Sequence, residues 1–260
     1  MSRALQAVLP IDVLGVPVVP ATMEEAVEWV DHAVSRRERL HVGVVNAAKI
    51  VNMRRDPELR SDVLASDVVF ADGMSVVWAS RLLGAALPER VTGIDLMHRI
   101  LERGRSRGYR VYVLGGPAEV VEVAAARMRE GHPGIEVVGR HHGYFTDDEE
   151  ESVASAIAGA SPDVLFVAMT SPRKERFLSR WSARLGVPVC HGVGGSLDVL
   201  AGKVDRAPEG WRRLGLEWLY RVKQEPRRLW RRYLVTNSVF VGLVVAELAR
   251  RALGRDRPLD

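Results

Sequence analysis

Short apolar runs alternate with amphipathic stretches along most of the chain. The apolar runs are rich in valine and cover residues 41–46, 68–71, 110–114, 135–138, 163–169 and 187–191. The stretches between them place apolar residues three and four positions apart, as one face of a helix does. Buried parallel strands read as continuous apolar runs. The pattern therefore predicts an α/β fold with a Rossmann-like, mostly parallel sheet covered by helices on both faces.

The balance of charged residues differs between this fold and the C-terminal part of the chain. Residues 203–260 carry 14 Lys+Arg and 7 Asp+Glu, whereas the other residues carry 23 and 26. We therefore expect a body at 1–202 and a basic appendage at 203–260 with an anionic partner. Trp211, Leu214 and Trp218 are spaced for one helical face. Tryptophans beside arginines suit a membrane surface, and the alternative is a helix packed on the body with a solvated basic face.

Composition narrows the class further. Hydrophobic residues make up 47% and charged residues 27%, which is ordinary for a soluble domain. The single cysteine, Cys190, excludes a disulfide framework, and the scattered histidines give no reason to expect a metal. The N-terminus lacks a basic region followed by an apolar run, so we expect a cytoplasmic protein. The apolar segment 238–252 is expected to be a helix too short to span a bilayer.

Two polar residues follow directly after expected strands. Asp72 ends the run Val68–Ala71, and Asn46 ends the strand before it. Ligands of parallel sheets bind outside the carboxyl ends of the strands, so Asp72 is placed where a general base would act and Asn46 faces it. The alternative for Asp72 is an N-cap or turn residue.

Two strand-to-helix turns are rich in glycine and are candidates for holding the diphosphate of a nucleotide. They contain Gly115 and Gly116 in the first turn and Gly192, Gly194 and Gly195 in the second. Neither is a GxGxxG fingerprint, and the strand after the first turn ends in Gly139-Arg140 with no acidic residue for a ribose. An NAD enzyme is disfavoured, and Arg140 leaves an NADP-linked oxidoreductase as an alternative.

Arg173 and Lys174 open the helix that follows the most apolar strand, and they add positive charge to the same edge of the sheet. Their alternative role is a solvated first helical turn.

Several of these segments, in this order, resemble the WecG/TagA/CpsF glycosyltransferase family over about residues 10–233. The segments are Asn46, 70–73, 93–95, 114–116, 143–145, 172–175, 192–195, 206–208 and 215–221. The resemblance implies a bacterial cytoplasmic enzyme that moves a sugar, typically N-acetylmannosamine, from UDP onto a polyprenyl-diphosphate-linked sugar. It implies an inverting reaction without a metal, in cell-surface polysaccharide assembly.

The resemblance also implies roles for individual residues. The family's catalytic Asp falls on Asp72 and its motif Asn on Asn46. The appendage is implied to bring the enzyme to the inner face of the cytoplasmic membrane and to complete the site. The appendage residues that we expect at the acceptor diphosphate or the lipid head groups are Arg206, Arg212, Arg221, Arg228, Trp211 and Trp218.

Three positions depart from the family pattern near the expected donor and acceptor. Family members often have Thr at the position of Val44. They usually have a Glu-containing motif after the Asn, where this chain continues to Lys49, and Gln at the position of Lys174. These departures leave the identity of the sugar open. A second alternative, an adaptor that binds membrane or nucleic acid, is weak for nucleic acid because no RNA-binding aromatic motif is present. The apolar C-terminal helix suits pairing with a second copy as well as packing, so the oligomeric state is also open.

Overall fold

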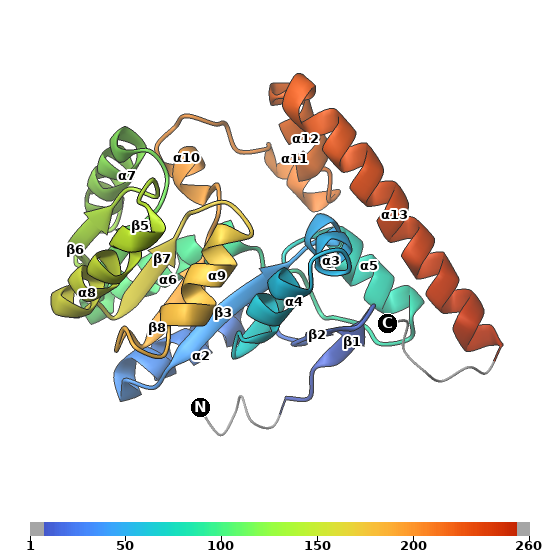
Figure 1. Ribbon diagram of the computed structural model, residues 1–260, viewed down its shortest axis with the longest axis horizontal. Helices are drawn as coiled ribbons and strands as arrows, with labels where there is room; N and C mark the ends of the chain where they lie inside the picture. Colours follow the sequence, from blue (N-terminus) through green and yellow to red (C-terminus); the bar gives the residue numbers. More distant parts are fainter. Residues whose placement is uncertain (1–7, 254–260) are drawn as a thin grey trace.

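The computed structural model describes residues 8–253, and the side chain of Arg228 lies outside this description. Its centre is a six-stranded, wholly parallel sheet in the order β4-β3-β8-β7-β5-β6 (Figure 1). These strands are β3 (Leu40–Val45), β4 (Val68–Ala71), β5 (Arg110–Leu114), β6 (Glu136–His141), β7 (Val164–Val167) and β8 (Val189–Gly192). A separate antiparallel hairpin joins β1 (Ile11–Val13) to β2 (Val16–Val18). The predicted parallel α/β fold is confirmed.

The helices lie on both faces of this sheet, as its valine-rich strands require. The helices of the body are α2 (Met23–Arg36), α3 (Ala47–Met53), α4 (Pro57–Leu64), α5 (Met74–Leu82), α6 (Gly93–Arg107), α7 (Ala118–Gly131), the 3-10 turn η1 (Asp147–Glu149), α8 (Glu150–Ala160), α9 (Arg173–Trp181) and α10 (Ser196–Leu200). A capping box begins α2, formed by Thr22 and Glu25, and a second, formed by Thr146 and Glu149, begins η1.

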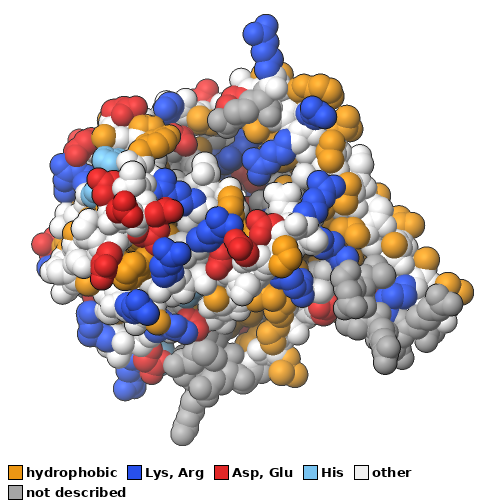
Figure 2. Space-filling model, viewed as in Figure 1, with side chains coloured by type: hydrophobic (Ala, Val, Ile, Leu, Met, Phe, Trp, Pro, Cys, Tyr) orange, Lys and Arg blue, Asp and Glu red, His pale blue; other side chains and the backbone are white. Residues whose placement is uncertain are grey.

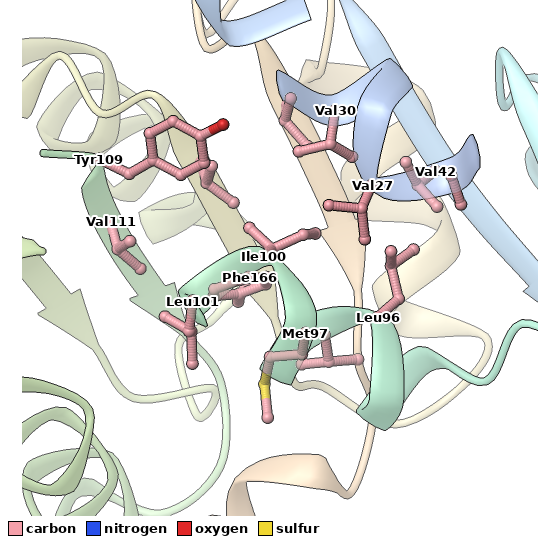
Figure 3. Packing of buried hydrophobic residues seen from close by; sticks show 14 of the residues in the cluster. Val27, Val30, Val42, Leu96, Met97, Ile100, Leu101, Tyr109, Val111 and Phe166 are labelled. Atoms are coloured by element: carbon pink, nitrogen blue, oxygen red, sulfur yellow. The ribbon is translucent and has the colours of Figure 1, made fainter. Parts of the chain in front are cut away.

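Alternation along each strand separates the two layers of the core. On β5, Val111 and Val113 join the cluster under α2, α6 and α7, whereas Tyr112 and Leu114 join the cluster under α8 and α9. Figure 3 shows the first cluster, in which Leu96, Met97, Ile100 and Leu101 of α6 pack with Phe166 of β7 and other apolar side chains. Successive side chains of a strand point to opposite faces, so each strand anchors both layers.

The strand β6 is longer than its apolar run suggests. It continues through Gly139 and Arg140 to His141, with a bulge opposite Val111 and Tyr112. At Gly139 an added Cβ would come within 2.3 Å of the Tyr112 ring, so the glycine lets the strand pass that ring. The strand therefore extends beyond the apolar run 135–138, because the ladder to β5 continues to His141.

The C-terminal part forms three helices: α11 (Glu209–Arg213), α12 (Glu217–Gln224) and α13 (Pro226–Ala252). The single helical face expected for Trp211, Leu214 and Trp218 was wrong, because Gly215 takes a left-handed φ of +69° and breaks the helix. The last helix begins at Pro226, well before residue 238, so the expectation that it is too short to span a bilayer was wrong. Its segment Leu229–Ala252 is long and apolar enough to cross a membrane, by length and composition alone.

Candidate active site

Asn46 and Asp72 lie at the carboxyl ends of the neighbouring strands β3 and β4, and their side chains contact each other. Asn46 is the N-cap of α3, and its Oδ1 accepts a hydrogen bond from the backbone N–H of Lys49 at 3.0 Å. This orientation leaves Asn46 Nδ2 to donate to Asp72 Oδ2 at 3.3 Å. Asp72 does not cap the following helix, since Gly73 is the N-cap of α5 and no side chain bonds there. The structure therefore brings together the two residues expected in one crevice.

The other oxygen of Asp72 is bound by a distant part of the chain. The backbone N–H of Gly93 donates to Asp72 Oδ1 at 2.9 Å, and that of Val91 donates to the carbonyl of Ala71 at 2.9 Å. Gly93 is the first residue of α6, whose N-cap is Thr92. A carboxylate at a helix N-terminus is favoured by the helix dipole. Two donors thus orient the carboxylate, which keeps lone pairs for a further proton or hydrogen bond.

A buried histidine forms a hydrogen bond to the backbone at Gly93. His191 on β8 is fully buried, and burial lowers its pKa to about 4. Its Nε2 lies 3.0 Å from the carbonyl oxygen of Gly93. Because a carbonyl only accepts, Nε2 carries the proton of the neutral ring. His191 is therefore a structural donor rather than a base at neutral pH.

A second polar cluster joins the starts of α3 and α9. Glu175 Oε1 pairs with Lys49 Nζ at 2.7 Å and with Lys174 Nζ at 2.5 Å, and all three side chains are almost fully buried. Burial alone raises the pKa of Glu175, but the two lysines outweigh it and hold the pKa at about 2. Burial and then Lys49 lower the pKa of Lys174 to about 8. Two of the three positions that depart from the family pattern thus share one carboxylate.

This cluster borders a small cavity beside β3, on the side of the sheet that α4 and α9 cover. The cavity has a volume of about 20 Å³, room for a single water, and it is lined by residues that include Val44, Lys49, Lys174, Glu175 and Gly192. The stem of Lys174 crosses Gly192, where an added Cβ would lie 2.9 Å from the lysine Cδ. Glu175 Oε2 is buried without a partner among the described residues. Val44, Lys49 and Lys174 therefore lie around one interior space.

Gly115 and Gly116 lie at the other end of the sheet edge, which we call the glycine end. Both have positive φ, and at Gly115 a Cβ would lie 2.5 Å from the carbonyl carbon of Ala168 after β7. The strands β5 and β7 are neighbours, but the chain continues from β5 to β6 on one side and from β7 to β8 on the opposite side. The gap between their carboxyl ends is therefore a topological switch point. Such a point is where open α/β sheets bind ligands. At about 4.8 Å per strand, the glycine end lies roughly 19 Å from Asp72.

The second glycine turn lies between these ends. Gly192 ends β8, Gly194 has a φ of +54°, and Gly195 precedes α10. Since β8 is two strands from β4, the turn lies roughly 10 Å from Asp72. The guanidinium of Arg221 reaches it, with one nitrogen 3.8 Å from the position of a Cβ at Gly195. The turn thus combines exposed backbone with a positive charge from the appendage.

Arg173 and Lys174 do not present their charges as freely as the sequence suggested. The guanidinium of Arg173 donates to the carbonyl of Phe145 and lies over the Phe145 ring, 4.5 Å from its centroid. Lys174 is buried in the cluster with Glu175. Arg173 therefore holds the 143–145 loop in place. Neither side chain is simply a solvated charge in the first turn of the helix.

The appendage, residues 203–260, is tied to the segment that holds Asp72. Arg90 Nη1 pairs with Glu217 Oε2 of α12 at 2.7 Å, and both side chains are mostly buried. Arg206 pairs with Asp95, whose other oxygen accepts a hydrogen bond from Thr92 Oγ1 at 2.6 Å. Burial raises the pKa of Asp95, but hydrogen bonds from Thr92 and Arg206 more than offset it and lower the pKa.

The other expected appendage residues are less engaged with the body. Trp211 packs edge-on against Tyr220, and Trp218 packs against Tyr233, each at 5.7 Å between ring centroids. Trp218 is 37% exposed. Nε of Arg212 is buried without a partner in the described part of the chain, and Arg228 has no described side chain. Across residues 8–253, no three His, Cys, Asp or Glu side chains gather in a way that could hold a metal ion.

Comparison with known proteins identifies the family of the chain. A model of the glycosyl transferase WecG/TagA/CpsF family matches residues 11–254. The chain belongs to this family. It is 36% identical over 180 residues, 69% of each chain, to an N-acetylglucosaminyldiphosphoundecaprenol N-acetyl-beta-D-mannosaminyltransferase of Bacillus spizizenii. The protein is thus a glycosyltransferase, and the oxidoreductase and adaptor alternatives are set aside.

Sequence reasoning missed several residues around the carboxylate of this WecG/TagA/CpsF protein. Arg90 and Glu217 were not singled out, because nothing in a linear pattern pairs two side chains so far apart. Gly93 was noted only as part of a motif, and its backbone N–H carries no sequence signal. His191 was grouped with the scattered histidines, and Glu175 was noted only as part of the 172–175 motif. The capping pattern Thr92–Asp95 was the one available signal, since it places a helix N-terminus near residue 93.

Proposed function

We propose that this glycosyltransferase moves N-acetylmannosamine from UDP to a polyprenyl-diphosphate-linked N-acetylglucosamine on the way to a cell-surface polysaccharide. The proposal extends to this chain the substrates in the name of its Bacillus spizizenii relative. Asp72 is the base, and Asn46 with the Gly93 N–H sets its orientation.

The chemical step is a direct displacement. Asp72 takes the proton of the acceptor hydroxyl while that oxygen bonds to the anomeric carbon of the donor. The bond from this carbon to the UDP oxygen breaks, and its electron pair leaves with UDP. Attack from the face opposite the leaving group inverts the anomeric configuration.

The departing diphosphate needs positive charge where its own charge develops. In the turn Gly192–Gly195, the N–H groups of Val193 and Gly194 donate to the carbonyl of Val167, so the proposed donors are the backbone N–H of the exposed Gly195 and the guanidinium of Arg221 beside it. The glycine end, with Gly115 and Gly116, is the place proposed for the nucleoside. We propose that these groups suffice without a metal ion, so that activity persists in EDTA.

A lipid-linked acceptor requires a protein that works at a bilayer surface. Figure 2 shows hydrophobic side chains along the outer edge of α13 and Lys and Arg side chains where α11 and α12 meet the body. Trp230, Leu234, Val241 and Val245 of α13 are each more than half exposed, and Arg231 and Arg232 are exposed among them. Exposed apolar side chains flanked by arginines suit the head-group region of an anionic membrane. We propose peripheral attachment to the inner face of the cytoplasmic membrane through this surface.

The observation that carries the proposal is the Asp72 carboxylate. It is held by Asn46 and Gly93 at the carboxyl edge of a parallel sheet, caps no helix, and keeps room to accept a proton.

The test is transfer from a panel of UDP-sugars to a short-chain lipid-diphosphate N-acetylglucosamine, with and without EDTA. We expect turnover with one donor and a kcat about 100- to 10,000-fold lower in Asp72→Asn, the range for losing a general base. Asp148→Asn, which alters an exposed aspartate of η1, is the matched control and keeps full activity. Full activity of Asp72→Asn would remove the assigned mechanism, and absence of turnover with every donor would remove the proposed substrates.

A further inference from the structure

Helix α5 begins two residues after Asp72 and carries a line of apolar side chains that is open to solvent. Met74, Trp78 and Leu82 follow one another at intervals of four residues, so they lie on one face of the helix. We call these three residues the α5 stripe. Trp78 is 46% exposed and Leu82 is 62% exposed, whereas the residues on the opposite face of α5 are buried in the core. Single exposed apolar residues are ordinary, but a line of them that starts beside a site indicates a binding surface.

The α5 stripe leads from Asp72 toward the last helix of the chain. At about 1.5 Å per residue, its three side chains cover roughly 12 Å along the helix axis. At the far end, the guanidinium of Arg251 in α13 donates to the carbonyl of Leu83, so the two helices lie side by side there (Figure 1). Near that end of α13, Val241 and Val245 are each 59% exposed. The stripe therefore connects the surroundings of Asp72 with a helix that is itself apolar on its outer face.

Trp78 is held in place in the middle of the α5 stripe. The backbone of Gly215 packs against it, because a Cβ added to Gly215 would lie 3.3 Å from the Trp78 ring and 2.7 Å from the Met74 Cβ. This contact supports one edge of the ring while nearly half of the residue stays open. A tryptophan that is already immobilised offers a large apolar surface at little further cost in side-chain entropy. The stripe is therefore preorganised to bind a hydrocarbon.

The acceptor named for the Bacillus spizizenii relative contains a hydrocarbon chain, since its N-acetylglucosamine is linked through a diphosphate to undecaprenol. When the acceptor sugar lies at Asp72, such a chain must follow the protein surface before it reaches a bilayer. Hydrocarbon that stays in water along this route costs free energy, and contact with apolar side chains removes that cost. The stripe is one side chain wide, which suits a single chain, whereas a bilayer contacts a broad surface such as that of α13.

We propose that the α5 stripe binds the isoprene units nearest the diphosphate of the acceptor, before the chain enters the membrane. The inference rests on the proposed function, which supplies the lipid-linked acceptor. Trp78 and Leu82 are then specificity-determining residues for the lipid part of the substrate, and they take no part in proton transfer. The enzyme accordingly prefers acceptors with a longer chain even where no bilayer is present.

The first test measures transfer to N-acetylglucosamine diphosphates that carry either one or three isoprene units, in solution without vesicles or detergent. We expect the wild-type KM for the acceptor to be about tenfold lower with the longer chain, the scale of burying a few CH₂ groups. In Leu82→Gln and in Trp78→Gln, the two acceptors differ in KM by less than about twofold. The value of kcat is retained, since contacts to the lipid are equally strong before and during the chemical step.

The matched control is Val123→Gln, which alters a 42% exposed residue of α7 beside β6, at the opposite edge of the sheet. It keeps the wild-type preference for the longer chain. Leu82→Gln keeps the test valid if Trp78→Gln unfolds, because it exchanges an exposed side chain for another good helix former.

Three outcomes of this test would overturn the proposal. They are equal KM values for both acceptors in wild type, a wild-type preference retained in both stripe variants, and an equal loss of preference in Val123→Gln. Sedimentation with anionic vesicles then separates the acceptor chain from the bilayer as the ligand of the stripe. If the stripe variants lost vesicle binding but kept the preference for the longer chain, the stripe would contact the bilayer and the proposal would be wrong.

The second test detects binding without transfer. Farnesyl diphosphate and inorganic diphosphate are added separately to the full chain, and a ligand that binds the folded protein raises its melting temperature. We expect farnesyl diphosphate to stabilise wild type and Val123→Gln more than inorganic diphosphate does. In Leu82→Gln and Trp78→Gln this difference disappears. Equal stabilisation of wild type and both stripe variants by farnesyl diphosphate would show that the stripe does not bind the chain.

The two readouts separate this inference from the proposed function. If the wild-type enzyme transferred none of the donors, the proposed substrates would fall while the melts with farnesyl diphosphate still tested the stripe. If the wild type transferred sugar equally well to both acceptors, the proposed reaction would stand and the lipid site would be lost.

Discussion

The two ends of the site are built from different chemical groups: polar side chains at one end and glycine backbone at the other. At the reaction end, which comprises Asn46, Asp72, Lys49, Lys174 and Glu175, each polar side chain pairs with another side chain: Asn46 with Asp72, and both lysines with Glu175. At the glycine end, Gly115 and Gly116 offer only backbone, packed against Ala168. A carboxylate that is proposed to take a proton needs its direction fixed by neighbouring groups. A surface that is proposed to approach a nucleotide needs its side chains removed.

The largest effect on the free energy of unfolding is expected for the most deeply buried charged cluster. Glu175→Gln leaves Lys49 and Lys174 in the interior without a carboxylate, which costs about 3 kcal/mol of unfolding free energy or more. Chemical denaturation at pH 7 measures it. Glu58→Gln, which alters the exposed pair between Glu58 of α4 and Arg176 of α9, is the control and changes stability by less than about 0.5 kcal/mol.

The same carboxylate gives a pH signature. The pKa of Glu175 is about 2 in the folded protein, below its ordinary value of 4.5. Its stabilising contribution is therefore complete above pH 4.5 and is lost as pH falls toward 2. Wild type and Glu175→Gln should converge in stability over this window, and a constant difference down to pH 2 would contradict the assigned ion pairs.

The next largest effect on stability is expected at the glycine end. Gly115→Ala adds a methyl group 2.5 Å from the Ala168 carbonyl carbon in a backbone conformation that alanine rarely adopts. We expect a loss of about 2–4 kcal/mol in unfolding free energy from overpacking and strain. UDP should then stabilise the variant less in thermal melts than it stabilises wild type. Gly131→Ala, where a methyl group meets nothing within 4 Å, is the control, and equal melting of the two variants would show that the close approach is not needed.

The smallest effect on stability is expected at Asn46, with a clear effect on activity. Asn46→Ser keeps a side chain that caps α3, so stability changes by less than about 0.5 kcal/mol. It removes the amide that donates to Asp72, and we expect kcat to fall about tenfold through looser positioning. Asn46→Ala adds the loss of the cap, about 1 kcal/mol. Equal kcat for Asn46→Ser and wild type would remove Asn46 from the reaction end.

The sequence predicted the elements of this fold because their signals are local. Apolar runs, capping boxes and glycine turns each depend on residues a few positions apart, and the facing of Asn46 and Asp72 follows from two successive parallel strands. The contacts between distant segments had no such signal. The Gly93 N–H that binds Asp72, the Arg90–Glu217 pair and the extension of β6 beyond its apolar run all depend on tertiary packing. The break at Gly215 was hidden because the apolar spacing continues across it.

The position of β8 in the sheet has a consequence for how the protein is made. This strand lies between β3 and β7, so until it forms, the first five sheet strands can pair only as two separate pieces, β4-β3 and β7-β5-β6. Asp72 belongs to one piece and Gly115 to the other. A ribosome must therefore complete residue 192 before Asp72 and Gly115 belong to one continuous sheet. A slip of one residue as β8 inserts would turn its buried side chains to the wrong faces.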